Sequence, residues 1–242
     1  MRQLFLPVGL ILAVLTALLL PGPGVFLASH HANRILICII FVVSGYQTGT
    51  KGIRLDHHLF RTLATAATIS LLLSPLLGLG LGTLLPLSPS LFLGLMIISS
   101  VPPTLSSGIV LTEISRGNTV LALLLTISLN LLGIFTLPLV LGLSLGNNGP
   151  MSIDQGALLI KMLLLVLLPF GLGRGIRSAL GKQRVSPYWS YVNSSCIILA
   201  VYASLSAARE AFFTTGPSEY ALIIASVVLI HFLLLGINAW AA

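Results

Sequence analysis

Long apolar runs dominate this chain, and short polar or glycine-rich stretches separate them. Most of the runs reach the roughly 18–20 residues that cross the hydrocarbon core of a bilayer. They do not alternate between apolar and polar positions, so the strands of a membrane barrel are excluded. We predict eight membrane helices, at residues 4–20, 35–46, 59–85, 91–115, 119–145, 157–173, 191–208 and 220–240.

The composition supports a membrane protein rather than a soluble one. Hydrophobic residues make up 56% of the 242 positions, charged residues 7%, and the mean hydropathy is +1.08. A water-facing surface needs far more charge. The first run resembles a signal peptide, but no small-x-small cleavage site follows it. We therefore predict a membrane helix there, followed by a loop at Pro21-Gly22-Pro23-Gly24.

The net charge of +7 reflects membrane topology rather than nucleic-acid binding. The basic residues fall mostly in two clusters between apolar runs, Lys51/Arg54/Arg61 and Arg174/Arg177/Lys182/Arg184. With the N-terminus inside, nine Lys and Arg residues lie inside and two outside, which satisfies the positive-inside rule. We predict a multi-pass protein with a cytoplasmic N-terminus, most simply in the plasma membrane.

The fourth run contains a segment that a continuous helix cannot accommodate. Pro102 and Pro103 have no N–H, so the carbonyls of Ile98 and Ser99 lose their helical donors. The helix is predicted to stop and restart, and such a break survives in a membrane only inside protein or beside a wet cavity. Freed carbonyls and hydroxyls suit a hard cation, and a new helix N-terminus near Thr104 suits an anion. A simple proline kink, with hydroxyls bonded to the preceding turn, remains the alternative.

A weak internal repeat is also present. Residues 38–45 and 196–203 share the pattern Cys-Ile-Ile and lie five predicted spans apart, as in an inverted repeat. This predicts a first five-helix repeat at residues 1–150 and a partial second repeat of three helices at 151–242. The chain ends without a charged flank, and we expect it to be truncated after the eighth helix.

The segment from Val101 to Thr112, followed by Arg116-Gly117-Asn118, resembles the bile acid:sodium symporter (SBF-like) family. The likeness is greatest to the orphan branch of proteins similar to sodium/bile acid cotransporter 7. It implies an all-α polytopic membrane protein with the ASBT-like inverted-repeat transporter fold. In that fold, helices four and nine are broken and cross. A panel of helices one, two, six and seven rocks against a core of the others.

The resemblance also implies a set of site residues. The sodium ligands would be Ser106, Ser107, Thr126 and Ser70, and Ser70 stands where better-studied members have a glutamine. The crossover and substrate positions would be Pro102, Pro103, Thr104, Gly108, Asn118 and Glu113. An ion pair with Arg116 is the alternative role for Glu113. Pro-Pro and serines replace the Gly-Gly and Asn of the bile-acid transporters. A ninth helix with its acidic ligand is absent from these residues.

The other polar residues do not indicate a metal or catalytic site. The loop pairs His30-His31 and His57-His58 lack a defined coordination geometry. His231 is interpreted as hydrogen-bonded packing. No nucleotide-binding, triad or zinc motif occurs, so an enzyme is not expected. The expected cofactors are none, with sodium as coupling ion and no other metal.

The sequence therefore predicts a sodium-coupled secondary transporter that moves an organic anion by alternating access. The anion would be a bile-acid or sterol conjugate, or a small carboxylate. The expected partners are sodium, the anion and the bilayer, without nucleic acid, and the oligomeric state is left open. Two alternatives remain, a non-transporting scaffold or regulator and an inactive truncated homologue. A proton-coupled antiporter would need a mid-membrane pair of acids, which the segment lacks.

Overall fold

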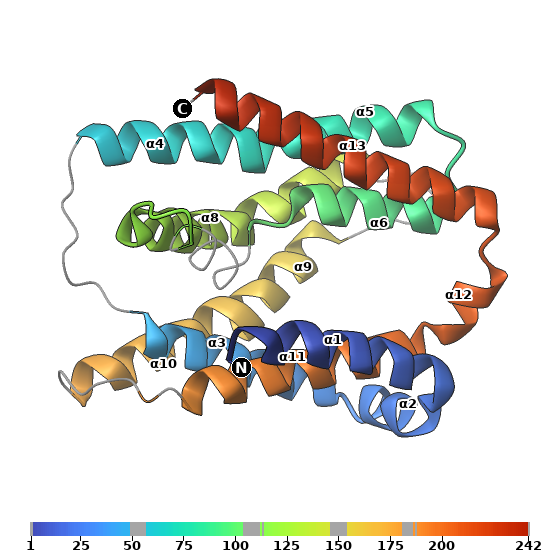
Figure 1. Ribbon diagram of the computed structural model, residues 1–242, viewed down its shortest axis with the longest axis horizontal. Coiled ribbons are helices and arrows are strands. Elements are labelled where there is room, and N and C mark those ends of the chain that lie inside the picture. Colours follow the sequence, from blue (N-terminus) through green and yellow to red (C-terminus); the bar gives the residue numbers. More distant parts are fainter. Residues whose placement is uncertain are drawn as a thin grey trace. The chain divides into compact units, whose positions relative to one another are not determined.

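The computed structural model describes residues 2–48, 57–103, 112, 114–145, 154–180, 186 and 188–241. These residues form helices and turns without a strand, so the protein is an all-α polytopic membrane protein, as predicted. The helices are α1 (Arg2–Leu19), α2 (Pro21–Ser29), α3 (Ala32–Gln47), α4 (His57–Ala67), α5 (Ser74–Leu84), α6 (Pro89–Ser100), α8 (Thr119–Leu145), α9 (Gln155–Met162), α10 (Leu168–Ala179), α11 (Tyr188–Ala207), α12 (Arg209–Thr214) and α13 (Pro217–Ala241) (Figure 1). Two π-helical turns, η1 (Thr68–Leu73) and η2 (Leu163–Leu167), connect α4 to α5 and α9 to α10.

Each predicted span contains a helix, although not all of these helices are long. Within the described residues, five helices are long and apolar enough to cross a membrane, and α1 with α2 makes up to six. The apolar helices α3 and α6 are shorter. The predicted loop at Pro21–Gly24 is wrong, because these residues begin α2, which lies at 97° to α1. Proline is accommodated in the first turn of a helix, where its missing N–H costs nothing.

Each π-helical turn precedes a proline. Pro75 follows η1 and Pro169 follows η2, each at the second position of the next α-helix. The residue before each proline bonds five residues back, Ser74 N–H to the Ile69 carbonyl and Leu168 N–H to the Leu163 carbonyl. The wider turn accommodates a proline that would clash with the carbonyl four residues earlier in a regular helix. Both spans thus continue past their prolines.

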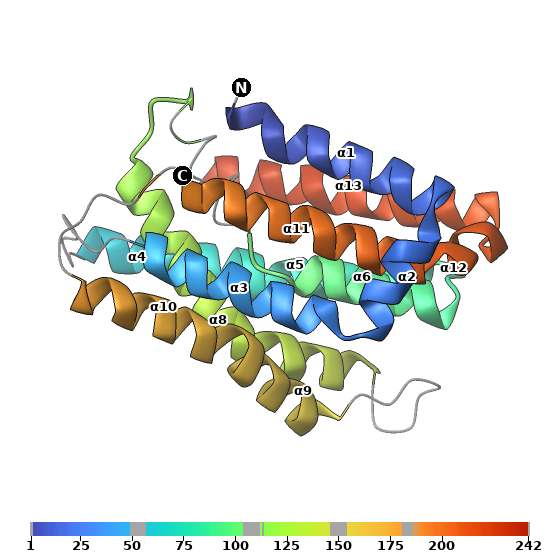
Figure 2. The same cartoon turned by 90° about the horizontal axis from the view of Figure 1, so that it is seen from below.

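The chain divides into two compact units. Unit 1 comprises Met1–Gly49 and Lys161–Thr215, and it gathers the first, second, sixth and seventh predicted spans. Its long helices form a row in which α1 packs on α11, α11 on α3 and α3 on α10 (Figure 2). This is the set of helices that the family resemblance assigns to the panel.

Within unit 1, α3 and α10 approach until their backbones touch. A Cβ atom added at Gly45 would clash with the Phe170 carbonyl, and one at Gly173 would clash with the Val42 carbonyl. Small residues at helix crossings in membranes permit this close approach. The contact fixes the separation of α3 and α10.

Arginines of α10 hold the C-terminal end of α3. Arg177 Nη1 donates to the carbonyls of Tyr46 and Gln47 at 2.8 and 2.6 Å, and Arg174 Nη1 lies 3.4 Å from the Thr48 carbonyl. Cations at a helix C-terminus offset its partial negative charge. Arg174 and Arg177 lie on α10, which extends to Ala179, so the predicted end of the sixth helix at residue 173 is too early.

Unit 2 comprises Thr50–Ile160 and Gly216–Ala242. Here α6 packs against α5, α8 and α13, and its residues Leu95 and Met96 are fully buried. The N-terminus of α6 is held by α13, because the Ser88 hydroxyl donates to a Glu219 carboxylate oxygen at 3.2 Å. The break predicted in the fourth span lies at the other end of α6, so unit 2 holds the candidate site.

Candidate functional site

Helix α6 ends where the twin prolines require it to end. The last helical residue is Ser100, and Val101 is extended, with φ −74° and ψ 129°. A residue before proline is driven out of the helical region, which accounts for this stop. Pro102 and Pro103 continue without helical structure. The predicted stop is thus observed, whereas the predicted restart lies outside the described residues.

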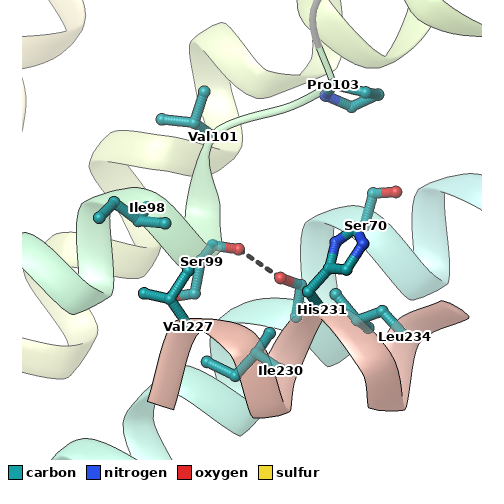
Figure 3. Close-up of a pocket in the computed structure, with 10 residues that line it drawn as sticks. Ser70, Ile98, Ser99, Val101, Pro103, Val227, Ile230, His231 and Leu234 are labelled. Atoms are coloured by element: carbon teal, nitrogen blue, oxygen red, sulfur yellow. Dashed lines mark hydrogen bonds between the residues drawn. The ribbon is translucent and has the colours of Figure 1, made fainter. Parts of the chain in front are cut away.

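One of the two freed carbonyls finds a partner on another helix. The hydroxyl of Ser74 donates to the Ser99 carbonyl at 2.7 Å, and both side chains are buried (Figure 3). In a regular helix this carbonyl would accept the N–H of residue 103, which Pro103 lacks. A Cβ at Gly78 would clash with Ser99, so glycine at this position allows α5 to come close enough for the bond. Ser74 is not among the site residues expected from the sequence.

The other freed carbonyl belongs to Ile98. Within the described residues no hydrogen bond reaches it, and Ile98 lines the cavity described below. The hydroxyls of Ser99 and Ser100 both donate to the Met96 carbonyl, at 3.1 and 2.6 Å. Back-bonding of this kind was expected for a simple kink, but here it occurs at a true helix end. Among the described residues, the Ile98 carbonyl is therefore the freed acceptor without a donor.

Helix α8 fixes the extended segment from the opposite side. Asn130 Nδ2 donates to the Pro103 carbonyl at 3.0 Å and to the Thr126 carbonyl at 2.8 Å. A Cβ at Gly133 would clash with Pro102, so the ring packs directly on the backbone of α8. Thr126, Asn130 and Gly133 share one face of α8 by their spacing. Asn130 was missed in the sequence, although an amide four residues after a candidate ligand was a usable signal.

A cavity of about 300 Å³ lies beside the break. Three parts of unit 2 line it, namely the η1–α5 region, the end of α6 and the helix α13. The lining residues are Ser70, Ser74, Ile98, Ser99, Val101, Pro103, Val227, Ile230, His231 and Leu234. Figure 3 shows the His231 ring beside Ser70. Hydroxyls, an imidazole and an interrupted backbone thus meet in an otherwise apolar pocket.

Apart from Asn118, the predicted site residues fall into three groups. Ser70 and Pro103 line the cavity, and Pro102 packs on α8 beside them. Thr126 is buried on α8 outside the cavity lining, and its hydroxyl donates to the Ala122 carbonyl at 2.7 Å. Thr104, Ser106, Ser107, Gly108 and Glu113 lie outside the described residues.

Asn118 has a clear structural role at the start of α8. Its Oδ1 accepts the Leu121 N–H at 3.0 Å, which makes Asn118 the N-cap of α8. The preceding turn at Arg116-Gly117 is tight, since Arg116 has φ 55° and the Gly117 N–H donates to the Thr112 carbonyl at 2.8 Å. A crossover role for Asn118 stays a prediction.

The sequence profile of the SBF-like CPA transporter family matches residues 3–242, nearly the whole chain. The chain belongs to this family. The resemblance found at the proline segment is thereby confirmed.

Curated relatives extend the comparison. The chain is 28% identical to the probable sodium/metabolite cotransporter BASS4, chloroplastic, of Oryza sativa subsp. japonica, over 99% of this chain and 58% of the relative. Identity to the protein of the same name in Arabidopsis thaliana is 29%, over 97% and 55%. An uncharacterized protein of Pseudomonas aeruginosa is 33% identical, over 86% and 65%. This SBF-like chain therefore spans a little over half the length of its plant relatives.

Proposed function

We propose that this protein is a sodium-coupled secondary transporter of a small organic anion. The observation that carries the proposal is the end of α6, where a helix C-terminus meets a cavity in unit 2. The Ile98 carbonyl at this end accepts no hydrogen bond from a described residue. A helix C-terminus carries partial negative charge and attracts cations. Broken helices of this kind form ion and substrate sites in many secondary transporters.

The family supports the same function. It is a transporter family, and the plant relatives are named as probable sodium/metabolite cotransporters. No enzymatic activity is proposed. The organic nature of the anion and the coupling by sodium belong to the proposal. So do a plasma-membrane location and a cytoplasmic N-terminus.

Alternating access would come from movement of unit 1 against unit 2. In unit 1 the row of helices runs α1, α11, α3, α10, which are the first, seventh, second and sixth spans. An inverted repeat of five spans makes the first span equivalent to the sixth and the second equivalent to the seventh. Exchanging these equivalent spans gives the same row in reverse, as the symmetry of an inverted repeat requires. The order supports a division into repeats at residues 1–150 and 151–242.

Sodium binding can be measured on the purified protein by thermal unfolding. We expect sodium to raise the melting temperature where potassium does not, because a ligand at 100 times its Kd stabilises by about 2.7 kcal/mol. Ser70→Ala, Ser106→Ala and Thr126→Ala should each weaken this response. Ser226→Ala is the matched control, since Ser226 is also buried with its hydroxyl donating four residues back, to Leu222, at 2.8 Å.

The sodium response of the variants tests the assignment of the sodium ligands. The sodium response and anion uptake of the wild type test the proposed function. An unchanged sodium response in all three ligand variants would contradict the assignment. A wild type that neither responds to sodium nor takes up any anion in vesicles would favour the non-transporting alternatives.

A further inference from the structure

One face of α13 lines the cavity beside the break, and it contains a single polar residue. Val227, Ile230, His231 and Leu234 line the cavity at positions i, i+3, i+4 and i+7 of the helix. This spacing places all four on one face. An imidazole therefore stands in an apolar stripe that otherwise suits simple packing.

The side chain of His231 lines the cavity and is exposed rather than packed inside the protein. Within the described residues its ring contacts Phe232, with centroids 5.7 Å apart, and forms no hydrogen bond. The interpretation of His231 as hydrogen-bonded packing therefore has no support among the described residues. An ionisable side chain within a membrane span is costly and indicates a site by default. The Ser70 hydroxyl, which lines the same cavity, also lacks a hydrogen bond to any described residue.

The two sides of the cavity differ in hydrogen-bonding character. The α6 side offers the Ile98 carbonyl and the helix C-terminus, which accept hydrogen bonds or bind a cation. The α13 side offers the imidazole N–H of His231, a donor. No carboxylate is among the lining residues, so none competes for that donor. A cation and an anion can thus occupy the pocket together.

We propose that His231 binds the anionic group of the transported substrate by donating a hydrogen bond to one of its oxygens. This inference rests on the proposed function and assigns the substrate site to a residue on α13. The rest of the substrate would contact Val101, Ile230 and Leu234. A volume of about 300 Å³ is at the small end of ligand pockets, so the substrate is a small anion rather than a sterol conjugate.

The experiment compares acids with neutral isosteres. Purified protein in saturating sodium chloride is titrated with acetate, isobutyrate, isovalerate and hexanoate, and separately with the corresponding primary amides, while the melting temperature is followed. We expect at least one acid to stabilise the wild type and its amide not to do so. His231→Ala should bind that acid roughly 10- to 100-fold more weakly, as for loss of a hydrogen bond to a charged group.

Two further variants separate the role of the donor from that of folding. His231→Gln keeps an N–H donor and should retain more of the binding than His231→Ala. Leu229→Ala truncates a half-exposed side chain of α13 outside the cavity lining and should match the wild type. All three variants should keep the response to sodium alone, which shows that they are folded.

Several results would overturn the proposal. These are equal binding of acid and amide by the wild type, unchanged acid binding by His231→Ala, or loss of the sodium response in His231→Ala, which would place the residue in the cation site. The proposal is also overturned if no acid raises the melting temperature of the wild type, whether or not sodium stabilises the protein. Failure of the sodium response in the wild type, together with no anion uptake in vesicles, instead contradicts the proposed function.

Discussion

Replacing Gly173 by alanine is expected to disrupt unit 1. The added methyl group would clash with the Val42 carbonyl and also approach the Tyr46 nitrogen, so it meets backbone rather than a flexible side chain. Overpacking typically costs 1–3 kcal/mol, and about 3 kcal/mol or more is expected here because neither helix backbone can give way locally. Thermal unfolding in detergent, with size-exclusion chromatography for the folded fraction, measures the loss.

Gly171 provides the matched control on the same helix. A Cβ at Gly171 meets nothing within 4 Å, so Gly171→Ala adds the same methyl group without a clash. Alanine also favours the helix over glycine by roughly 0.5–1 kcal/mol. We expect Gly171→Ala to match or exceed the stability of the wild type. Similar melting of the two variants would show that the α3–α10 contact is not as tight as the structure has it.

Replacing Ser74 by alanine is expected to destabilise the end of α6. The Ser99 carbonyl would lose its only described donor while remaining buried. Leaving a buried acceptor unsatisfied costs about 1–3 kcal/mol. The melting temperature should fall, and the sodium response should weaken because the break is no longer held in place.

Thr83→Val is the control for a lost hydroxyl on α5. Thr83 is bonded to the carbonyls of Leu79 and Gly80, four and three residues back in its own helix, at 2.9 and 3.0 Å. Removing this hydroxyl leaves no carbonyl between helices without a donor. Little change in the melting temperature is therefore expected. If Ser74→Ala and Thr83→Val melt alike, the hydrogen bond between α5 and α6 does not stabilise the break.

Much of the fold follows from local sequence. The fifth span was predicted at its observed limits, Thr119 and Leu145, because an apolar run bounded by polar turns is sufficient to define a membrane helix. The stop at Ser100 follows from the covalent structure of proline, which acts on its own neighbours. The helix at Pro21–Ser29 was missed, since Pro-Gly-Pro-Gly is typical of a loop unless other helices hold it.

The partners of the break could not be predicted in this way. Ser74 and Ser99 are 25 residues apart, and Asn130 and Pro103 are 27 apart, so no local pattern connects them. His231 is more distant still in sequence and reaches the cavity only through the packing of α13 on α5 and α6. Read alone, a histidine in an apolar span resembles any packed histidine.

The sequence by itself determined that the chain crosses a membrane repeatedly and that regular helical bonding is interrupted at Pro102 and Pro103. Hydropathy and the missing proline N–H are properties of single residues and their neighbours, and so they can be read without coordinates. Only the tertiary structure decided which freed carbonyl is satisfied and which side chains surround the other. Those outcomes depend on how closely separate helices approach, and glycines such as Gly78 and Gly133 set that distance through contacts far away in the chain.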